Sequence, residues 1–182
     1  MPEKSITDEQ LLELLASEFT FERGFGLLVT AYKQRLYWHI RRIVHSHEDA
    51  DDALQNTFVK VYKGIAHFEG KSKLYTWLYR IATNEALSMV QQRSKHQAGS
   101  LEENDAVAVL KADPWFEGDE TRLLLLSAIA GLPEKQRLVF NLRYYDEMPY
   151  EEMSVILGTS TGALKASFHH AVRKIEQTIR EG

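Results

Sequence analysis

The chain has 182 residues, a net charge of −4 and a pI near 6.0, with ordinary shares of apolar and charged residues. Cysteine is absent, which excludes disulfides, thiolate zinc sites and cysteine nucleophiles. The polar N-terminus is not a secretory signal, and the longest apolar run, residues 123–132, is about half the roughly 20 residues needed to span a bilayer. We therefore expect a cytoplasmic protein with no membrane-inserted segment.

Helical periodicity dominates the first 96 residues, and no segment shows the alternation of a strand. Thr7 and Gln10 form a capping box that predicts a helix through residues 11–15. Apolar steps predict a second helix over 22–44. Ser46, followed by acids that suit a helix N-terminus, predicts a third helix to about residue 67. Gly70 ends that pattern, and Ser72 begins a fourth helix through residue 89.

Residues 97–119 have weak periodicity, one proline, two glycines and an acidic run. This pattern predicts a linker, because structureless segments of this length are rare inside a compact domain. Helices are expected again over 120–130, 133–145, 150–157 and 161–180. The expected fold is therefore all-α, with two small helical domains, 1–96 and 120–182, joined by a flexible acidic linker at 97–119.

Charge is distributed unevenly along the chain. Residues 99–121 carry seven acids and one base, a local charge of −6, which leaves +2 for the remainder. Residues 60–96 carry seven bases and two acids. Because phosphate contacts depend on Lys and Arg, a basic region followed by an acidic tether is compatible with nucleic-acid binding despite the negative net charge.

The last two predicted helices form a closely joined pair. Gly158 suits the left-handed residue that ends a helix, and Ser160 suits the N-cap of the next helix. The final helix has an apolar stripe, and its opposite face carries Lys165, Ala166, His169, His170 and Arg173. This pattern indicates a helix-turn-helix whose second helix enters the major groove of DNA. An ordinary helical hairpin with a solvated basic face is the structural alternative.

A second polar face lies on the helix predicted after Gly70. Lys73, Trp77, Arg80 and Asn84 recur there at helical steps, away from the stripe of Leu74, Leu78 and Ile81. An indole beside two cations and an amide suits a surface that holds phosphates while it stacks on, or pairs with, an unstacked base. The alternative places Trp77 at the edge of the core and leaves the basic residues in solvent.

Two long stretches resemble one protein family. EDADDALQNTFVKVYKGIAHFEGKSKLYTWLYRIATNEAL resembles region 2 of a bacterial RNA polymerase sigma factor of the extracytoplasmic-function (ECF) type. LPEKQRLVFNLRYYDEMPYEEMSVILGTSTGALKASFHHAVRKIE resembles region 4 of the same family. The resemblance implies a non-enzymatic subunit without a cofactor that joins core RNA polymerase, recognises the −10 and −35 elements of promoter DNA and assists promoter melting. It also implies control by an anti-sigma factor, which in this family is usually membrane-anchored.

The resemblance assigns three sets of residues. The polymerase-binding set would face arginines of the clamp coiled coil and comprises Asp49, Asp52, Gln55 and Asn56, the last standing where the family usually has Glu. The −10 set comprises Phe68, Lys71, Lys73, Trp77, Arg80 and Asn84. The −35 set comprises Ser160, Thr161, Lys165, Ser167, His169, His170 and Arg173. Many members have Arg where this chain has Ser167, so we expect Lys165 and the two histidines to carry more of the base reading.

Two other functions compete with this interpretation. A stand-alone helix-turn-helix regulator would account for the C-terminal helices but would leave the Trp77 face and the acidic linker without a role. A metal-dependent enzyme could be centred on His45, His47, Glu48, Asp49, Asp51 and Asp52. Acids gather at helix N-termini for the electrostatic reason given above, so no metal site is expected there.

Overall fold

The computed structural model describes residues 6–44, 46–96 and 120–181. Within these ranges the regular secondary structure consists of eight α-helices and one short 3-10 helix, which confirms the all-α fold. The predicted linker, residues 97–119, lies outside the described residues. The domain limits at residues 96 and 120 remain a prediction.

The first helices begin where the sequence signals place them. In α1 (Asp8–Leu15), the Gln10 N–H donates to Thr7 Oγ1 at 3.3 Å, and the Thr7 N–H donates to Gln10 Oε1 at 3.0 Å. The second helix is α2 (Phe21–Val44). The hydroxyl of Ser46 caps α3 (His47–Gly64) by accepting from the Asp49 N–H at 3.1 Å. The fourth, α4 (Leu74–His96), continues well beyond the predicted end near residue 89.

The end of α3 differs from the prediction. The α-helix stops at Gly64, and a 3-10 helix, η1 (Ile65–His67), replaces the last predicted turn. The tighter turn uses the Phe68 N–H to satisfy the Ile65 carbonyl at 3.0 Å, a common way to close a helix end. The indole of Trp77 covers Gly64, where an added Cβ would lie 3.4 Å from the ring.

The C-terminal helices match their predicted bounds to within one residue. They are α6 (Glu120–Ala130), α7 (Glu134–Tyr144), α8 (Tyr150–Leu157) and α9 (Thr161–Glu181). Gly158 has a φ of 61° and ends α8, as predicted. Ser160 then opens α9, because its hydroxyl accepts from the Ala163 N–H at 3.3 Å. The pair α8 and α9 is therefore the predicted helix-turn-helix.

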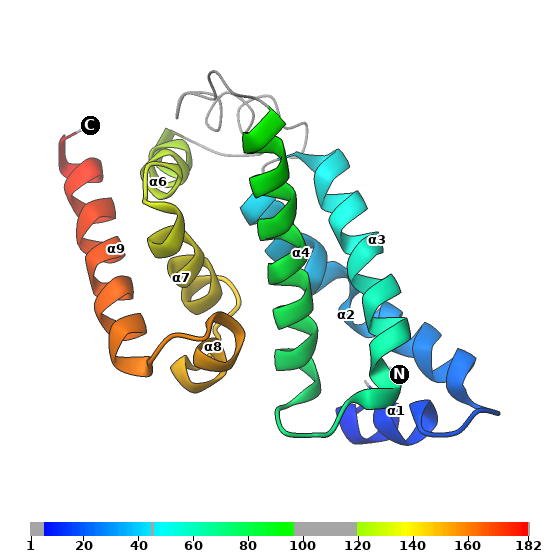
Figure 1. The fold of residues 1–182 in the computed structure, drawn as a ribbon. Coiled ribbons are helices and arrows are strands. Elements are labelled where there is room, and N and C mark those ends of the chain that lie inside the picture. The colour runs from blue at the N-terminus through cyan, green and yellow to red at the C-terminus, as the bar shows by residue number, and fades with distance from the viewer. Residues whose placement is uncertain (1–5, 45, 97–119, 182) are drawn as a thin grey trace.

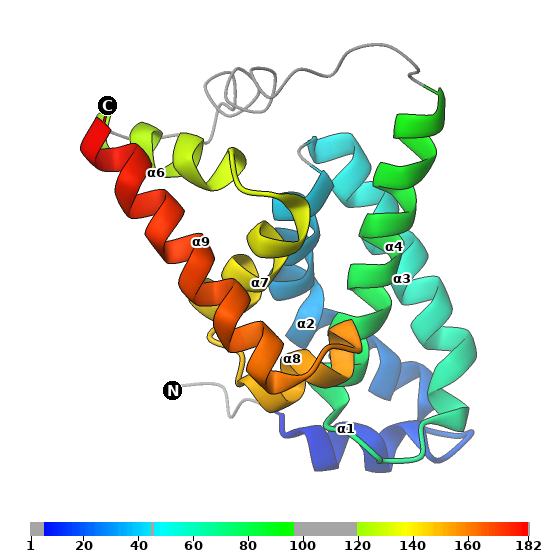
Figure 2. The same cartoon turned by 60° about the vertical axis from the view of Figure 1, so that its left-hand side comes forward.

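Helices α2, α3 and α4 pack against one another, and α1 packs on α2 (Figure 1). Gly24 permits the close contact with α1, since a Cβ there would lie 2.9 Å from the Leu14 Cβ. Helices α6–α9 lie beside this bundle, with α8 against α4 and α7 against α2 (Figure 2). Met148 and Met153 of the second unit join the same buried cluster as Leu36 and Leu78 of the first. The two units thus share the larger apolar cluster, and a smaller cluster that includes Phe140 and Ile175 lies within the second unit.

We expect Gly158→Ala to destabilise the helix-turn-helix. The left-handed backbone at this position costs about 1 kcal/mol once a Cβ is present. Urea denaturation followed by circular dichroism should show a correspondingly lower midpoint. Gly162→Ala is the matched control, because the space around this residue of the first turn of α9 is open. Alanine there should be neutral or stabilising. Equal losses from the two substitutions would contradict the role of Gly158.

Candidate nucleic-acid interface

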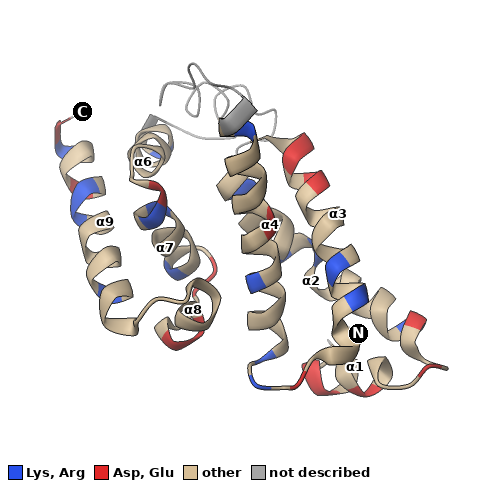
Figure 3. Cartoon of the chain, in the orientation of Figure 1, with Lys and Arg blue, Asp and Glu red and all other residues tan. Residues whose placement is uncertain are grey.

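The exposed side of α4, together with the residue just before the helix, presents three of the polar residues predicted for this face. Lys73, Arg80 and Asn84 are all exposed. Figure 3 shows the basic positions along this helix. Two cations and an amide on one helix side can hold phosphates and offer a donor and an acceptor to a base edge. The structure therefore brings these three groups together as the sequence predicted.

Trp77 does not share that exposure. Its side chain is half-buried, packs on the main core and lies against Phe68, with ring centroids 5.3 Å apart and planes inclined by 53°. The geometry matches the alternative in which Trp77 sits at the edge of the core. Phe68 is also half-buried, so the two rings form a partly open aromatic surface between the end of α3 and α4. Such surfaces stack unpaired bases.

The loop before α4 carries Lys73 and supplies one further cation, Lys71. Lys71 is exposed and pairs with Glu69 across Gly70, a contact between two solvent-exposed groups that contributes little stability. Lys73 lies 3.0 Å from a carboxylate oxygen of Glu152, and this hydrogen bond raises the pKa of Lys73. Glu152 belongs to α8, so the second unit already occupies part of the predicted −10 surface.

The outer side of α9 presents four of the residues predicted for the −35 element. Lys165, His169, His170 and Arg173 are exposed. The ammonium of Lys165 lies 5.7 Å from the ring centroid of Tyr150 in α8, within cation–π range. A long, mobile side chain is thereby held over the helix-turn-helix, where a DNA-reading group would have to be.

The side chains of the other three members of the −35 set are less free to contact DNA. Ser160 is exposed, but its hydroxyl caps α9. Thr161 and Ser167 are half-buried, and Ser167 lies on the flank of the buried stripe of Leu164 and Ala171. The geometry therefore favours the four exposed residues as the principal contacts.

The polymerase-binding set is divided in the same way. Asp52, Gln55 and Asn56 are exposed on α3. Asp49 is 4% exposed and pairs with Arg93 of α4. The structure thus directs Asp49 toward a partner within the chain and leaves the other three on the surface.

The sequence reasoning missed two residues on this side of α3. Val59 and Tyr62 are 46% and 44% exposed, and they follow Asp52 and Gln55 at helical steps of three and four. The Tyr62 hydroxyl donates to Glu22 at 2.8 Å, and its ring meets Phe25 edge-on at 5.0 Å. An apolar strip within a polar surface is typical of a docking site. Helical steps of three and four, continued along the sequence from Asp52 and Gln55, could have revealed it.

The described members of the alternative metal site are not gathered around one point. Among residues 6–44, 46–96 and 120–181, no group of three or more His, Asp or Glu side chains is placed to hold a metal ion. His47 lies 2.5 Å from the Tyr37 hydroxyl, and Asp49 is held by Arg93. His45 lies outside the described residues. Within the same described residues, none of the helices combines the length and the apolar character that crossing a membrane requires.

Comparison with known proteins gives matches in both units. Residues 28–96 match the family described as Sigma-70 region 2, and residues 122–175 match Sigma-70, region 4. The chain is 28% identical to the RNA polymerase sigma-H factor of Pseudomonas aeruginosa, covering 95% of this chain and 94% of that protein. It is 27% identical to the ECF RNA polymerase sigma-E factor of Escherichia coli strain K12, covering 97% and 96%.

Two solved structures share the fold. A sigma factor RpoE in complex with the anti-sigma factor NepR from Bartonella quintana has a TM-score of 0.70 at 22% identity, covering 87% of this chain and 98% of that one. CnrH in complex with the cytosolic domain of CnrY also has a TM-score of 0.70 at 22% identity, covering 96% and 97%.

An all-helical protein that carries region 2 and region 4 in this order, with a polar helix face in each, is a bacterial transcription initiation subunit of the sigma class. The chain belongs to the sigma-70 family and, within it, to the ECF sigma factors. Its function is promoter-specific initiation of transcription.

Proposed function

We propose that this chain binds core RNA polymerase through Asp52, Gln55 and Asn56 of α3 and reads the promoter through two separate helices. The side of α4 with Lys73, Arg80 and Asn84, together with Phe68 and Trp77, reads and opens the −10 element. The outer side of α9 reads the −35 element. The observation that carries this proposal is the exposure of these polar groups on the helices that match regions 2 and 4.

The net negative charge of the chain fits a polymerase subunit better than an independent DNA-binding protein. A net charge of −4 opposes binding to duplex DNA, because most non-specific affinity comes from neutralised phosphates. A large polymerase can supply those phosphate contacts, while the two helix faces of this chain supply selectivity. The chain then needs neither a cofactor nor catalytic residues of its own.

Reconstitution tests this function directly. The purified chain is mixed with bacterial core polymerase and a library of promoter fragments, and transcripts are sequenced. We expect the chain to co-elute with core and to direct initiation from a defined set of start sites. A stand-alone regulator would instead shift duplex DNA by itself and leave start sites unchanged. Failure to join core polymerase would overturn the proposal.

Lys165 provides a test of the −35 assignment. Lys165→Ala should reduce transcription from promoters that depend on the −35 element roughly 5-fold or more, since one good side-chain contact to a base contributes about 1 kcal/mol or more of discrimination. Lys33→Ala, an exposed lysine of α2, removes the same charge outside the helix-turn-helix. Initiation rates measured with intact and scrambled −35 sequences separate reading from general affinity. The same loss from both substitutions would remove Lys165 from the reading set.

We also propose that an anti-sigma factor, in this family often membrane-anchored, controls the chain in the cytoplasm, where polymerase and DNA are found. The support is the likeness of the fold to a sigma factor solved with the anti-sigma factor NepR, and to CnrH solved with the cytosolic domain of CnrY. Capture of bound proteins from the native bacterium, followed by mass spectrometry, would identify the partner.

A further inference from the structure

The contact between the two units is built around two acidic side chains of the second unit. Glu152 of α8 bridges Lys73, the residue just before α4, and Thr76 in its first turn: one carboxylate oxygen accepts from the buried Thr76 hydroxyl, and the other lies 3.0 Å from Lys73 Nζ. Partial burial opposes ionisation of Glu152, but the hydrogen bonds from Thr76 and Lys73 outweigh it and hold its pKa below the ordinary value. Glu152 is therefore a carboxylate seated on the start of the −10 helix.

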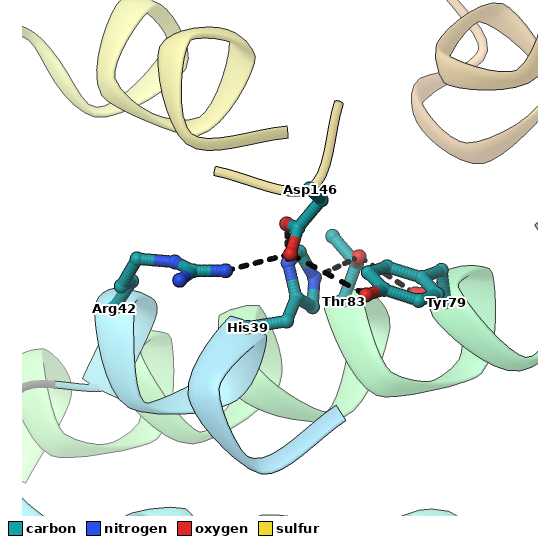
Figure 4. Close-up of polar contacts among 5 residues, drawn as sticks. All are labelled: His39, Arg42, Tyr79, Thr83 and Asp146. Atoms are coloured by element: carbon teal, nitrogen blue, oxygen red, sulfur yellow. Dashed lines mark hydrogen bonds and ion pairs between the residues drawn. The ribbon is translucent and has the colours of Figure 1, made fainter. Parts of the chain in front are cut away.

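Asp146, in the turn between α7 and α8, enters the first unit more deeply (Figure 4). Its side chain is 6% exposed, with one oxygen 3.2 Å from His39 Nδ1 and the other 2.6 Å from an Arg42 nitrogen. The Tyr79 hydroxyl donates to the same carboxylate at 3.3 Å, and burial together with this carboxylate raises the pKa of Tyr79. His39, in turn, lies 2.8 Å from the Thr83 hydroxyl. One acid thus joins α2, α4 and the second unit.

Four acidic residues lie at positions 146, 147, 151 and 152, and the contacts described above are made by Asp146 and Glu152. Glu147 and Glu151, the neighbours of Asp146 and Glu152 in sequence, are exposed. The two inserted acids are close in sequence to Met148 and Met153, whose side chains are 2% and 0% exposed in the shared cluster. A buried aspartate without partners costs roughly several kcal/mol of free energy, so the polar contacts fix the orientation in which the two units dock. The methionines contribute the burial of apolar surface.

This packed arrangement is incompatible with simultaneous reading of both promoter elements. By their names, the −10 and −35 elements are about 25 base pairs apart, or roughly 80 Å of DNA. A compact chain of this size has a radius of gyration of about 16 Å and is only about half that length across. The units must separate before α4 and α9 can reach their elements, so the contacts of Asp146 and Glu152 must break.

We propose that Asp146 and Glu152 form an acidic latch that holds the free chain closed and covers the start of the −10 helix until core polymerase and promoter DNA displace it. This proposal rests on the proposed function of α4. The latch places carboxylates on Lys73 and Arg42, where DNA phosphates would otherwise be attracted. The closed chain therefore has weak affinity for single-stranded −10 DNA, and opening uncovers that surface.

The test compares two variants of equal charge. Asp146→Asn with Glu152→Gln removes the latch, whereas Glu147→Gln with Glu151→Gln makes the same charge change on the exposed neighbours. Since the chain has no cysteine, Ser88→Cys in α4 and Gln177→Cys in α9 provide two unique labelling sites for energy transfer between the units. Fluorescence anisotropy with a single-stranded −10 oligonucleotide, taken from a promoter used in the transcription assay, measures whether the −10 surface of α4 has become accessible.

We expect the latch variant to lose energy transfer and to bind the oligonucleotide roughly 5- to 50-fold more tightly than the control variant. Thr76→Val leaves every charge in place and should also lower energy transfer and raise the affinity for the oligonucleotide. This variant replaces the double variant in the test if the double variant does not fold. Unchanged energy transfer in folded latch variants would overturn the latch. Opening without tighter binding would overturn the covering of α4. Transcription with core polymerase reports separately on the proposed function, because the latch variant should still initiate at the same start sites.

Discussion

Asn84→Ala should slow promoter opening by roughly 5- to 150-fold while leaving the affinity for core polymerase unchanged. The amide of Asn84 is exposed on the side of α4 that also presents Arg80, and it can pair with the edge of an unstacked base. A well-placed contact of this kind contributes about 1–3 kcal/mol, which gives the expected range. Alanine keeps the helix and removes only the pairing group.

Two measurements separate opening from binding. A fluorescent base analogue in the −10 element reports opening, and sedimentation with core polymerase reports association. Ser88→Ala, at an exposed position one turn further along α4, is the matched control and should behave as the unchanged chain. On a template whose −10 region is already unpaired, the defect should persist if Asn84 reads the base. Normal opening by the Asn84→Ala chain on intact promoters would remove this residue from the −10 set.

The structure also explains why the sequence left two interpretations of Trp77 open, one as a −10 contact and one at the edge of the core. Helical steps place residues 73, 77, 80 and 84 on one side of a helix, but they do not reveal what lies against that side. The end of α3 and Phe68 cover part of the indole, because Gly64 leaves room for the ring. Periodicity along one helix carries no information about a neighbour that is distant in sequence, and so exposure was predicted correctly for Asn84 and only in part for Trp77.

Local signals predicted most of the fold. The capping box at Thr7, the cap at Ser46 and the left-handed Gly158 each depend on residues within four positions, and each is present. The polar groups between units could not be predicted in this way. Asp146 meets His39 and Tyr79 across 107 and 67 residues of sequence, and nothing in its neighbourhood distinguishes it from Glu147. The latch is a tertiary property that only the packed arrangement reveals.

Asp52→Lys combined with Gln55→Ala should weaken association with core polymerase by roughly 30-fold or more. Both side chains are exposed on α3, and the sigma resemblance places arginines of the clamp opposite them. Breaking one pair of opposite charges in such an interface costs about 2 kcal/mol or more, and the new lysine adds repulsion. Glu13→Lys, at an exposed position of α1, reverses one charge elsewhere in the same unit and should have little effect.

Measuring the binding at two ionic strengths provides a second, independent test of this prediction. If the loss is electrostatic, raising the salt from 0.05 to 0.5 M should narrow the difference between the double variant and the unchanged chain, because the Debye length falls below about 5 Å. A difference that is equally large at both concentrations would instead indicate lost packing, for which the apolar strip of Val59 and Tyr62 is the nearest source. Unaltered binding of the double variant at low salt would show that this side of α3 does not face the polymerase at all, and the docking assignment would have to move to another helix.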